Sequence, residues 1–266
     1  MGRFREYNQD RIKKKVDILI GEAMTKEDVF IPILESIKNK DIKEFAEYLI
    51  EHDCPNYFYE IGASSTGKYH PQYAIGELGL ARHTCALVRF LIWITELEYV
   101  KEKINDRTRD LLIVAGLVHD WKKLGEENEK QRYTIFLHPI LAANTIRKYS
   151  GKFLTQEEIG FIASCVETHM GEFNRDKKSA DALPKPQNDY QFLVHLADYL
   201  ASRKSLEMEF DDWKKPELPP LDSYVLTFGK YKDRKLLEIA SEDKGYIDWL
   251  KENYGREPLR SMLKQL

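Results

Sequence analysis

The sequence lacks the features that mark a secreted or membrane-spanning protein. Its 266 residues include only 3 cysteines, widely spaced and odd in number, which predicts reduced thiols in a cytoplasmic protein and not a disulfide framework. A net charge of −3 excludes strong overall basicity, so any affinity for nucleic acid must come from local patches. The longest apolar runs, such as residues 111–118, are too short to span a bilayer, and the charge-rich residues 2–15 do not resemble a signal peptide. We therefore expect no membrane association.

What the sequence does contain is mostly helical periodicity. Residues 1–52 predict two or three amphipathic helices that pack on the following domain, which we place at residues 53–210. A proline-rich linker is expected at 211–223, and a small α+β module at 224–266, with a strand over 224–228 and helices from Leu236 and Tyr246. The sequence thus predicts a mainly α fold. After a loop-rich stretch that ends near residue 77, five helices are expected over residues 77–102, 108–118, 139–149, 155–168 (opened by a Thr-x-x-Glu capping box) and 190–208.

The histidines carry most of the functional information. A single inward-facing histidine is more often a hydrogen-bonded core residue than a ligand, and a single helical aspartate is more often a cap or a surface charge. Here, however, four histidines and two aspartates would each have to be buried and satisfied separately. Convergence on metal removes all of these desolvation costs together, because neutral imidazole and carboxylate are preferred ligands of divalent transition metals. The six residues are His83, His119, Asp120, His138, His169 and Asp198.

The order of these six residues resembles the HD-domain superfamily of metal-dependent phosphohydrolases over roughly residues 57–206. His119-Asp120, followed by Lys-Leu-Gly at 123–125, is similar to the family's His-Asp-Ile-Gly-Lys signature. Glu-Thr-His-Met-Gly at 167–171 and Leu-Ala-Asp at 196–198 are similar to its later motifs. The dipeptide His52-Asp53 is the same pair, but no apolar helix leads into it, so we expect it to lie outside the site.

This resemblance implies an HD-domain helical bundle that binds two divalent transition metals and hydrolyses a phosphoester with a metal-activated water. Nitrogen-rich ligation favours Mn, Fe, Co, Ni or Zn over Mg, which prefers oxygen. Asp120 and Lys123 are the implied catalytic residues; Lys123 would stabilise developing charge, with a solvated lysine as the alternative. In the implied ligand sets, Asp120 bridges one metal held by His83, His119 and Asp198 and a second metal held by His138 and His169.

A narrower resemblance lies upstream. Residues 63–70 (ASSTGKYH) and 79–84 (GLARHT) are similar to the branch that contains 3′-to-5′ exoribonucleases of the YhaM type and related phage proteins. This branch implies a phosphodiesterase or nuclease on single-stranded nucleic acid. The alternatives are hydrolysis of nucleotides or nucleotide signals and, third, a non-catalytic nucleotide-binding scaffold. Candidate substrate contacts are Lys68, His70, Arg82 and Arg203, each with a structural alternative as a turn, ion-pair or surface residue; His195, one helical turn before Asp198, is expected to support the ligands from outside.

The last segment has its own resemblance. Residues 227–235 (TFGKYKDRK), followed by Tyr246 and Trp249, resemble the small C-terminal module of exonuclease X-type DNA exonucleases. Basic and aromatic residues interleave there, which suits contact with a nucleic-acid backbone and stacking of bases. In the alternative interpretation the hairpin is a solvated turn, and Phe228, Tyr246 and Trp249 form the core of the module. The candidate nucleic-acid contacts are Lys230, Tyr231, Lys232 and Arg234.

Overall fold

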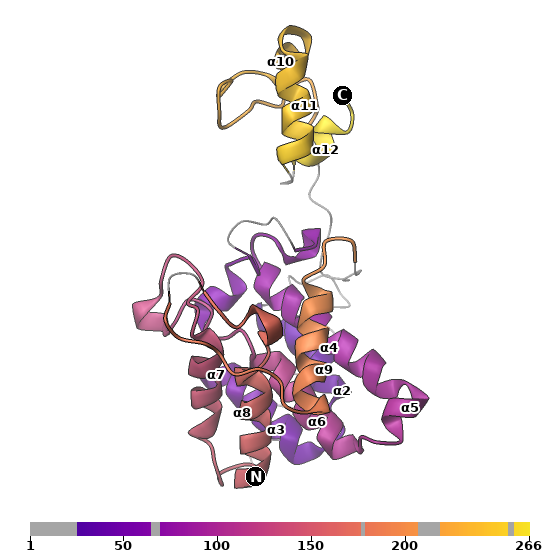
Figure 1. Cartoon of the computed structure of the whole chain (residues 1–266), viewed down its shortest axis with the longest axis vertical. Helices are drawn as coiled ribbons and strands as arrows, with labels where there is room; N and C mark the ends of the chain where they lie inside the picture. The colour runs from indigo at the N-terminus through magenta and orange to yellow at the C-terminus, as the bar shows by residue number, and fades with distance from the viewer. Residues whose placement is uncertain (1–25, 65–69, 177–178, 207–218, 255–257) are drawn as a thin grey trace.

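The computed structural model describes residues 26–64, 70–176, 179–206, 219–254 and 258–266, and helices dominate it (Figure 1). The mainly α fold is confirmed. Short 3₁₀ segments are η1 (Lys26–Phe30), η2 (Asn56–Tyr59), η3 (Gln72–Ala74), η4 (Glu127–Glu129) and η5 (Gly171–Phe173). The α-helices are α2 (Ile31–Ser36), α3 (Lys40–His52), α4 (Gly79–Glu96), α5 (Glu98–Lys101), α6 (Asp106–Val118), α7 (His138–Arg147), α8 (Gln156–Glu167), α9 (Asp189–Ala201), α10 (Leu236–Glu242), α11 (Lys244–Asn253) and α12 (Leu259–Leu263).

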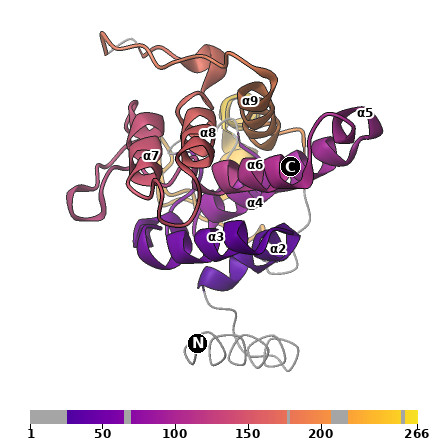
Figure 2. The same ribbon diagram turned by 90° about the horizontal axis from the view of Figure 1, so that it is seen from below.

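Helix α6 is the centre of the helical body. Residues 109–118 are all buried, and the helix packs against α4, α8 and α9. Its approach to α4 requires Gly116, because a Cβ there would lie 2.7 Å from Leu87 Cδ2. Figure 2 shows α2 and α3 side by side along the same body, and both helices contribute to its hydrophobic core. The apolar run that predicted a central buried helix therefore forms α6, against which the surrounding helices pack.

Some helices begin or end at capping contacts, and two of them end before the boundary that the apolar pattern predicted. The predicted capping box forms at Thr155, whose hydroxyl accepts from the Glu158 backbone N–H. The helix expected over 77–102 is interrupted at Leu97, between α4 and α5. The helix expected over 190–208 ends at Ala201, where side chains donate hydrogen bonds to the last carbonyls of the helix. The Ser202 hydroxyl donates to the Asp198 carbonyl at 3.0 Å, and Arg203 Nε donates to the Tyr199 carbonyl at 3.1 Å.

The C-terminal segment has a hydrophobic cluster of its own, built from α10, α11 and α12, and Figure 1 shows it apart from the helical body. The strand predicted over 224–228 does not form; within the described residues the hairpin has a single antiparallel bridge, Val225 to Lys235. The strand prediction was wrong because the chain turns at Gly229, with φ of +73°, before a ladder can extend. Helix α12 was not predicted. Most of the predicted linker, and residues 1–25 of the predicted N-terminal helices, lie outside the described residues.

All three cysteines lie in the described part of the chain, and none of them is in a disulfide there. No helix in the described part of the chain has the length and apolar character needed to cross a membrane.

Candidate metal centre

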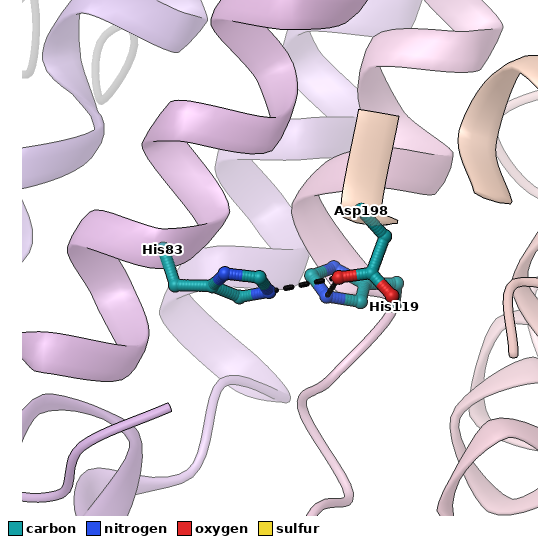
Figure 3. Close-up of side chains that lie close together, drawn as sticks. All are labelled: His83, His119 and Asp198. Carbon is teal, nitrogen blue, oxygen red and sulfur yellow. Dashed lines mark ion pairs between the residues drawn. The ribbon is translucent and has the colours of Figure 1, made fainter. Parts of the chain in front are cut away.

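The six predicted ligands converge at one end of the helical body. Asp198 is partly exposed and the other five side chains are buried. Figure 3 shows three of the six, with a carboxylate oxygen of Asp198 facing the rings of His83 and His119. The residues come from five helices: His83 lies within α4, His119 and Asp120 follow the end of α6, His138 starts α7, His169 lies just after α8, and Asp198 lies within α9.

Two carboxylates organise the imidazoles. Asp198 Oδ1 lies 3.0 Å from His83 Nε2 and 3.8 Å from His119 Nε2. Asp120 Oδ1 lies 3.0 Å from His138 Nε2 and 3.8 Å from His169 Nε2, and Asp120 Oδ2 lies 3.4 Å from His119 Nε2. Two groups have their ligand atoms within 4.8 Å of one another: His83 with His119 and Asp198, and His119 with Asp120 and His169. These groups share His119, whereas the family resemblance implied sharing through Asp120, so the division into two metal sites stays a proposal.

Three of the histidines are held in one tautomer by the backbone. In His119, His138 and His169, Nδ1 lies 2.7 to 2.8 Å from the carbonyl oxygen three residues earlier in the chain. A carbonyl only accepts, so Nδ1 carries the proton and Nε2 presents a lone pair to the site. Within the described residues, the buried Nε2 atoms of His119 and His138 have no hydrogen-bond partner. Lone pairs therefore face carboxylate oxygens, an arrangement that a cation completes.

The electrostatics of the cluster favour the charge states that ligands need at Asp120 and His169, but not at His119. Burial opposes ionisation of Asp120, but Lys123 and His119 outweigh it and hold its pKa well below the ordinary range. Burial lowers the pKa of His169 to about 3, which keeps that ring neutral. Burial also acts to lower the pKa of His119, but the neighbouring Asp120 carboxylate outweighs it and raises that pKa. A bound metal would compete with a proton at His119.

The turn after Asp120 is secured by a residue that the sequence did not single out. The Tyr57 hydroxyl lies 2.8 Å from the carbonyls of both Trp121 and Gly125, and it accepts from the Leu124 N–H at 3.3 Å. This turn carries Lys123, whose Nζ lies 2.5 Å from Asp120 Oδ2. Tyr57 comes from the distant segment η2, so no local pattern could have marked it.

Behind His169, a glycine and a histidine fit together. His195 Nδ1 lies 2.8 Å from the His169 carbonyl and its Nε2 lies 2.7 Å from Glu172 Oε2. Gly171 has φ of +54°, and a Cβ on it would lie 2.2 Å from the His195 ring. The glycine of the 167–171 motif is therefore needed for both its backbone conformation and this contact. His195 contacts the backbone of a ligand, as the expectation of a supporting role required.

A cavity of about 580 Å³ opens onto the cluster. Lys123, His70 and Arg203 line it, while Lys68 lies outside the described residues. His70 is largely buried, and burial lowers its pKa to about 3, so it would meet a phosphate as a neutral hydrogen-bond partner and not as a cation. Arg82 does not line the cavity; its guanidinium is buried and donates to the Glu77 carbonyl at 3.2 Å.

The second His-Asp pair is separate from this site, as expected. His52 stacks on Tyr48, with ring centroids 4.0 Å apart. Asp53 accepts from the Tyr149 hydroxyl at 2.6 Å. Neither residue lines the cavity.

In the C-terminal module, most of the predicted nucleic-acid contacts already have partners. Lys230 Nζ lies 3.1 Å from Asp243 Oδ2, which also accepts from the Tyr231 hydroxyl at 2.9 Å. Arg234 donates twice to Glu242, at 2.8 and 2.6 Å. Lys232 is exposed, and no carboxylate in the described part of the chain pairs with it. Phe228 and Tyr246 pack against the module's core, as the alternative interpretation supposed, whereas Trp249 is half-exposed.

Comparison with known protein families agrees with the resemblances noted for the helical body and for the C-terminal module. The family model described as HD domain matches residues 80–203, which include all six predicted ligands. The family model described as exodeoxyribonuclease X-like C-terminal matches residues 226–254, from the hairpin to the end of α11. No curated protein and no solved structure matches the chain.

Proposed function

We propose that this chain, which carries an HD domain of the metal-dependent phosphohydrolases and an exodeoxyribonuclease X-like C-terminal domain, is a phosphodiesterase that acts on single-stranded nucleic acid. The observation that carries the proposal is the set of buried imidazole lone pairs that face Asp120 and Asp198. A buried polar atom without a partner costs about 1–3 kcal/mol, and a cation bound between these rings and the carboxylates would remove that cost.

The donor set fits a divalent transition metal. Four imidazole nitrogens and two carboxylates favour Mn, Fe, Co, Ni or Zn, and we propose two ions per chain. Bound there, the metal would polarise phosphoryl oxygens and lower the pKa of a coordinated water towards neutrality. His83, His119, Asp120, His138, His169 and Asp198 are the proposed ligands.

The surrounding side chains have distinct proposed roles. Lys123 places a positive charge beside Asp120, where it would stabilise negative charge that develops on the phosphoryl group. His70 and Arg203 lie on the cavity wall and would position the substrate's phosphates by hydrogen bonds and by charge respectively. His195 fixes the His169 backbone and so keeps that ring aimed into the site.

The choice of a polymeric substrate rests on the C-terminal domain. Its family match is to a domain of a DNA exonuclease, and its surface offers Lys232 and a half-exposed Trp249. Hydrolysis of free nucleotides or nucleotide signals is the alternative, because the cavity alone serves either substrate. A non-catalytic nucleotide-binding scaffold is disfavoured, since it would keep six converging metal-binding side chains without use.

The test uses the full chain, purified without chelators. Elemental analysis should find close to two transition-metal ions per chain. Labelled RNA, single-stranded DNA and a panel of nucleotides are then incubated with Mn²⁺, with chelator-treated protein as the control. Cleavage of single strands above all nucleotides supports the proposal. Cleavage of nucleotides alone would establish the alternative, and absence of both metal and activity after reconstitution would favour the scaffold.

A further inference from the structure

We infer that Phe173 and Tyr199 form an aromatic wall that stacks a nucleobase of the substrate, with Arg203 beside it to hold a phosphate. This inference rests on the proposed function and deepens it, because it assigns the part of the cavity that would recognise a base. The wall is defined as these two aromatic side chains, both of which line the cavity that contains Asp120.

The wall is tied to the metal centre by the backbone. Phe173 ends η5, four residues after His169, and Tyr199 directly follows Asp198 in α9. Two proposed ligands therefore fix the position of the two rings relative to the reacting phosphoryl group. A base that stacks on either ring would belong to a nucleotide close to the bond that is cleaved.

The two rings are parallel, and one of them is open to the cavity. Phe173 and Tyr199 are nearly parallel, with 8° between their planes and 6.4 Å between their centroids. Phe173 is 51% exposed although it lines a cavity, so much of its apolar face has no protein neighbour. An exposed aromatic face beside a phosphohydrolase centre suits an occupant that is planar, aromatic and linked to phosphate. Nucleobases meet all three requirements, and every base has a π-face that can stack.

Arg203 supplies the charge that the wall lacks. Its guanidinium carbon lies 4.0 Å from the centroid of the Tyr199 ring, and its Nε is used by the Tyr199 carbonyl. Among the described residues, no carboxylate forms an ion pair with this guanidinium, so its terminal N–H groups can meet a phosphate. The acidic side chain of Glu172 contacts His195 Nε2 at 2.7 Å and interacts with Arg203 only through space, so the guanidinium keeps its hydrogen-bond donors for a phosphate. The guanidinium therefore lies on the Tyr199 side of the pocket, and the exposed Phe173 ring offers the apolar surface for the base.

The experiment measures binding to the metal-loaded full chain. The probes are a short fluorescent single strand with non-hydrolysable phosphorothioate links and an abasic strand of the same length. Phe173→Ala and Tyr199→Ala should each weaken binding of the base-containing strand roughly tenfold, as expected for one lost stack, and should change binding of the abasic strand by less than about twofold. Tyr199→Phe keeps the ring and should restore affinity to within about twofold of the original.

Phe192→Ala is the matched control, because Phe192 is 52% exposed on the same helix as Tyr199 but does not line the cavity. It should bind both strands as the unchanged protein does. Equal affinity of Phe173→Ala and the unchanged chain for the base-containing strand, or an equal loss for both strands, would overturn the inference. If unmodified single strands are hydrolysed in the separate activity assay but the wall variants bind the phosphorothioate probes normally, the proposed function stands without the wall. If no phosphodiester is hydrolysed but the wall variants lose base-dependent binding, the wall stands and the proposed function fails.

Discussion

In the helical body, two histidine nitrogens of the metal centre are buried without a hydrogen-bond partner, whereas in the C-terminal module two of the basic side chains are at the surface and in ion pairs. Nε2 of His119 and of His138 has no hydrogen-bond partner in the described part of the chain, but Lys230 and Arg234 reach the carboxylates of Asp243 and Glu242. An unpaired buried atom is costly, so it indicates that a ligand is missing. An exposed ion pair contributes little and is readily exchanged for a phosphate, so it neither indicates nor excludes a ligand.

The largest expected effect is the difference in activity between variants of the two His-Asp pairs. His119-Asp120 is buried in the metal centre, whereas His52-Asp53 lies outside it. We expect His119→Ala and Asp120→Asn to remove bound metal and to lower hydrolysis by more than the roughly 10–100-fold that loss of a ligand's supporting contact typically causes. The control variants His52→Ala and Asp53→Asn change the same residue types at a pair that lies outside the cavity, with His52 exposed and Asp53 partly buried. They should keep metal content and activity within about twofold.

Elemental analysis and a steady-state assay on all four variants measure this difference, with circular dichroism to confirm that each is folded. Equal losses at both pairs would contradict the assignment of the centre to His119-Asp120. Full activity of Asp120→Asn would do so as well.

Tyr57→Phe should have the next largest effect, because it removes one hydroxyl from the turn that carries Lys123. The carbonyls of Trp121 and Gly125 would lose a buried donor, which costs about 1–3 kcal/mol of unfolding free energy. Activity should fall through kcat more than through KM, since the turn positions Lys123 and not the distal substrate. Chemical denaturation and steady-state kinetics measure both. The control is Tyr73→Phe, which removes another buried hydroxyl, one that donates to the Ala201 carbonyl at 3.3 Å and not to the turn. A drop in stability with unchanged kcat would show that the turn does not need Tyr57 to place Lys123.

These residues show which parts of the site and of the fold could be predicted from the sequence. The six proposed ligands could be singled out because each lies on an apolar helix face or at a helix end, which is a local signal, and because their order resembles a known family. Tyr57 and the contact of Gly171 with His195 could not, because they depend on segments brought together only by tertiary packing. The end of α9 at Ala201 was also missed, since the capping by Ser202 and Arg203 competes with an apolar pattern that continues. The strand at 224–228 was wrong because its β-forming residues lie next to a tight turn at Gly229.

A smaller effect on stability is expected at Arg107, which joins three helices of the body by ion pairs. It donates to Asp41 at 2.8 and 3.1 Å and to Glu158 at 2.5 Å, and these contacts lower the pKa of both carboxyl groups. A lowered carboxyl pKa in the folded state stabilises the protein above the ordinary pKa, near pH 4, and this stabilisation is lost as the pH falls through the folded value.

Arg107→Gln should therefore lower the unfolding free energy at pH 7 by less than about 1 kcal/mol, because the groups are partly exposed to solvent. The difference between the variant and the unchanged protein should shrink as the pH is lowered below about 4. Urea denaturation at several pH values measures it. A difference that stays constant across this range would mean that packing, and not charge, explains the role of Arg107.

The smallest expected effect tests whether the paired surface of the module hides a binding site. Asp243→Asn keeps an oxygen that can accept from the Tyr246 N–H at the start of α11, but it removes the charge that faces Lys230. If the module binds single strands, the freed lysine should raise affinity about twofold and steepen the dependence of log K on log salt by up to about 0.7, the value of one added phosphate contact. Asp233→Asn is the matched control, because it makes the same charge change on the same hairpin at an exposed position where no ion pair is recorded among the described residues. Equal changes in the two variants would mean that only net charge matters. A change in Asp243→Asn alone would show that the module's ion pairs compete with nucleic acid. Surface ion pairs in the C-terminal module would then be compatible with a binding site, whereas in the helical body the site is marked by buried atoms without a hydrogen-bond partner.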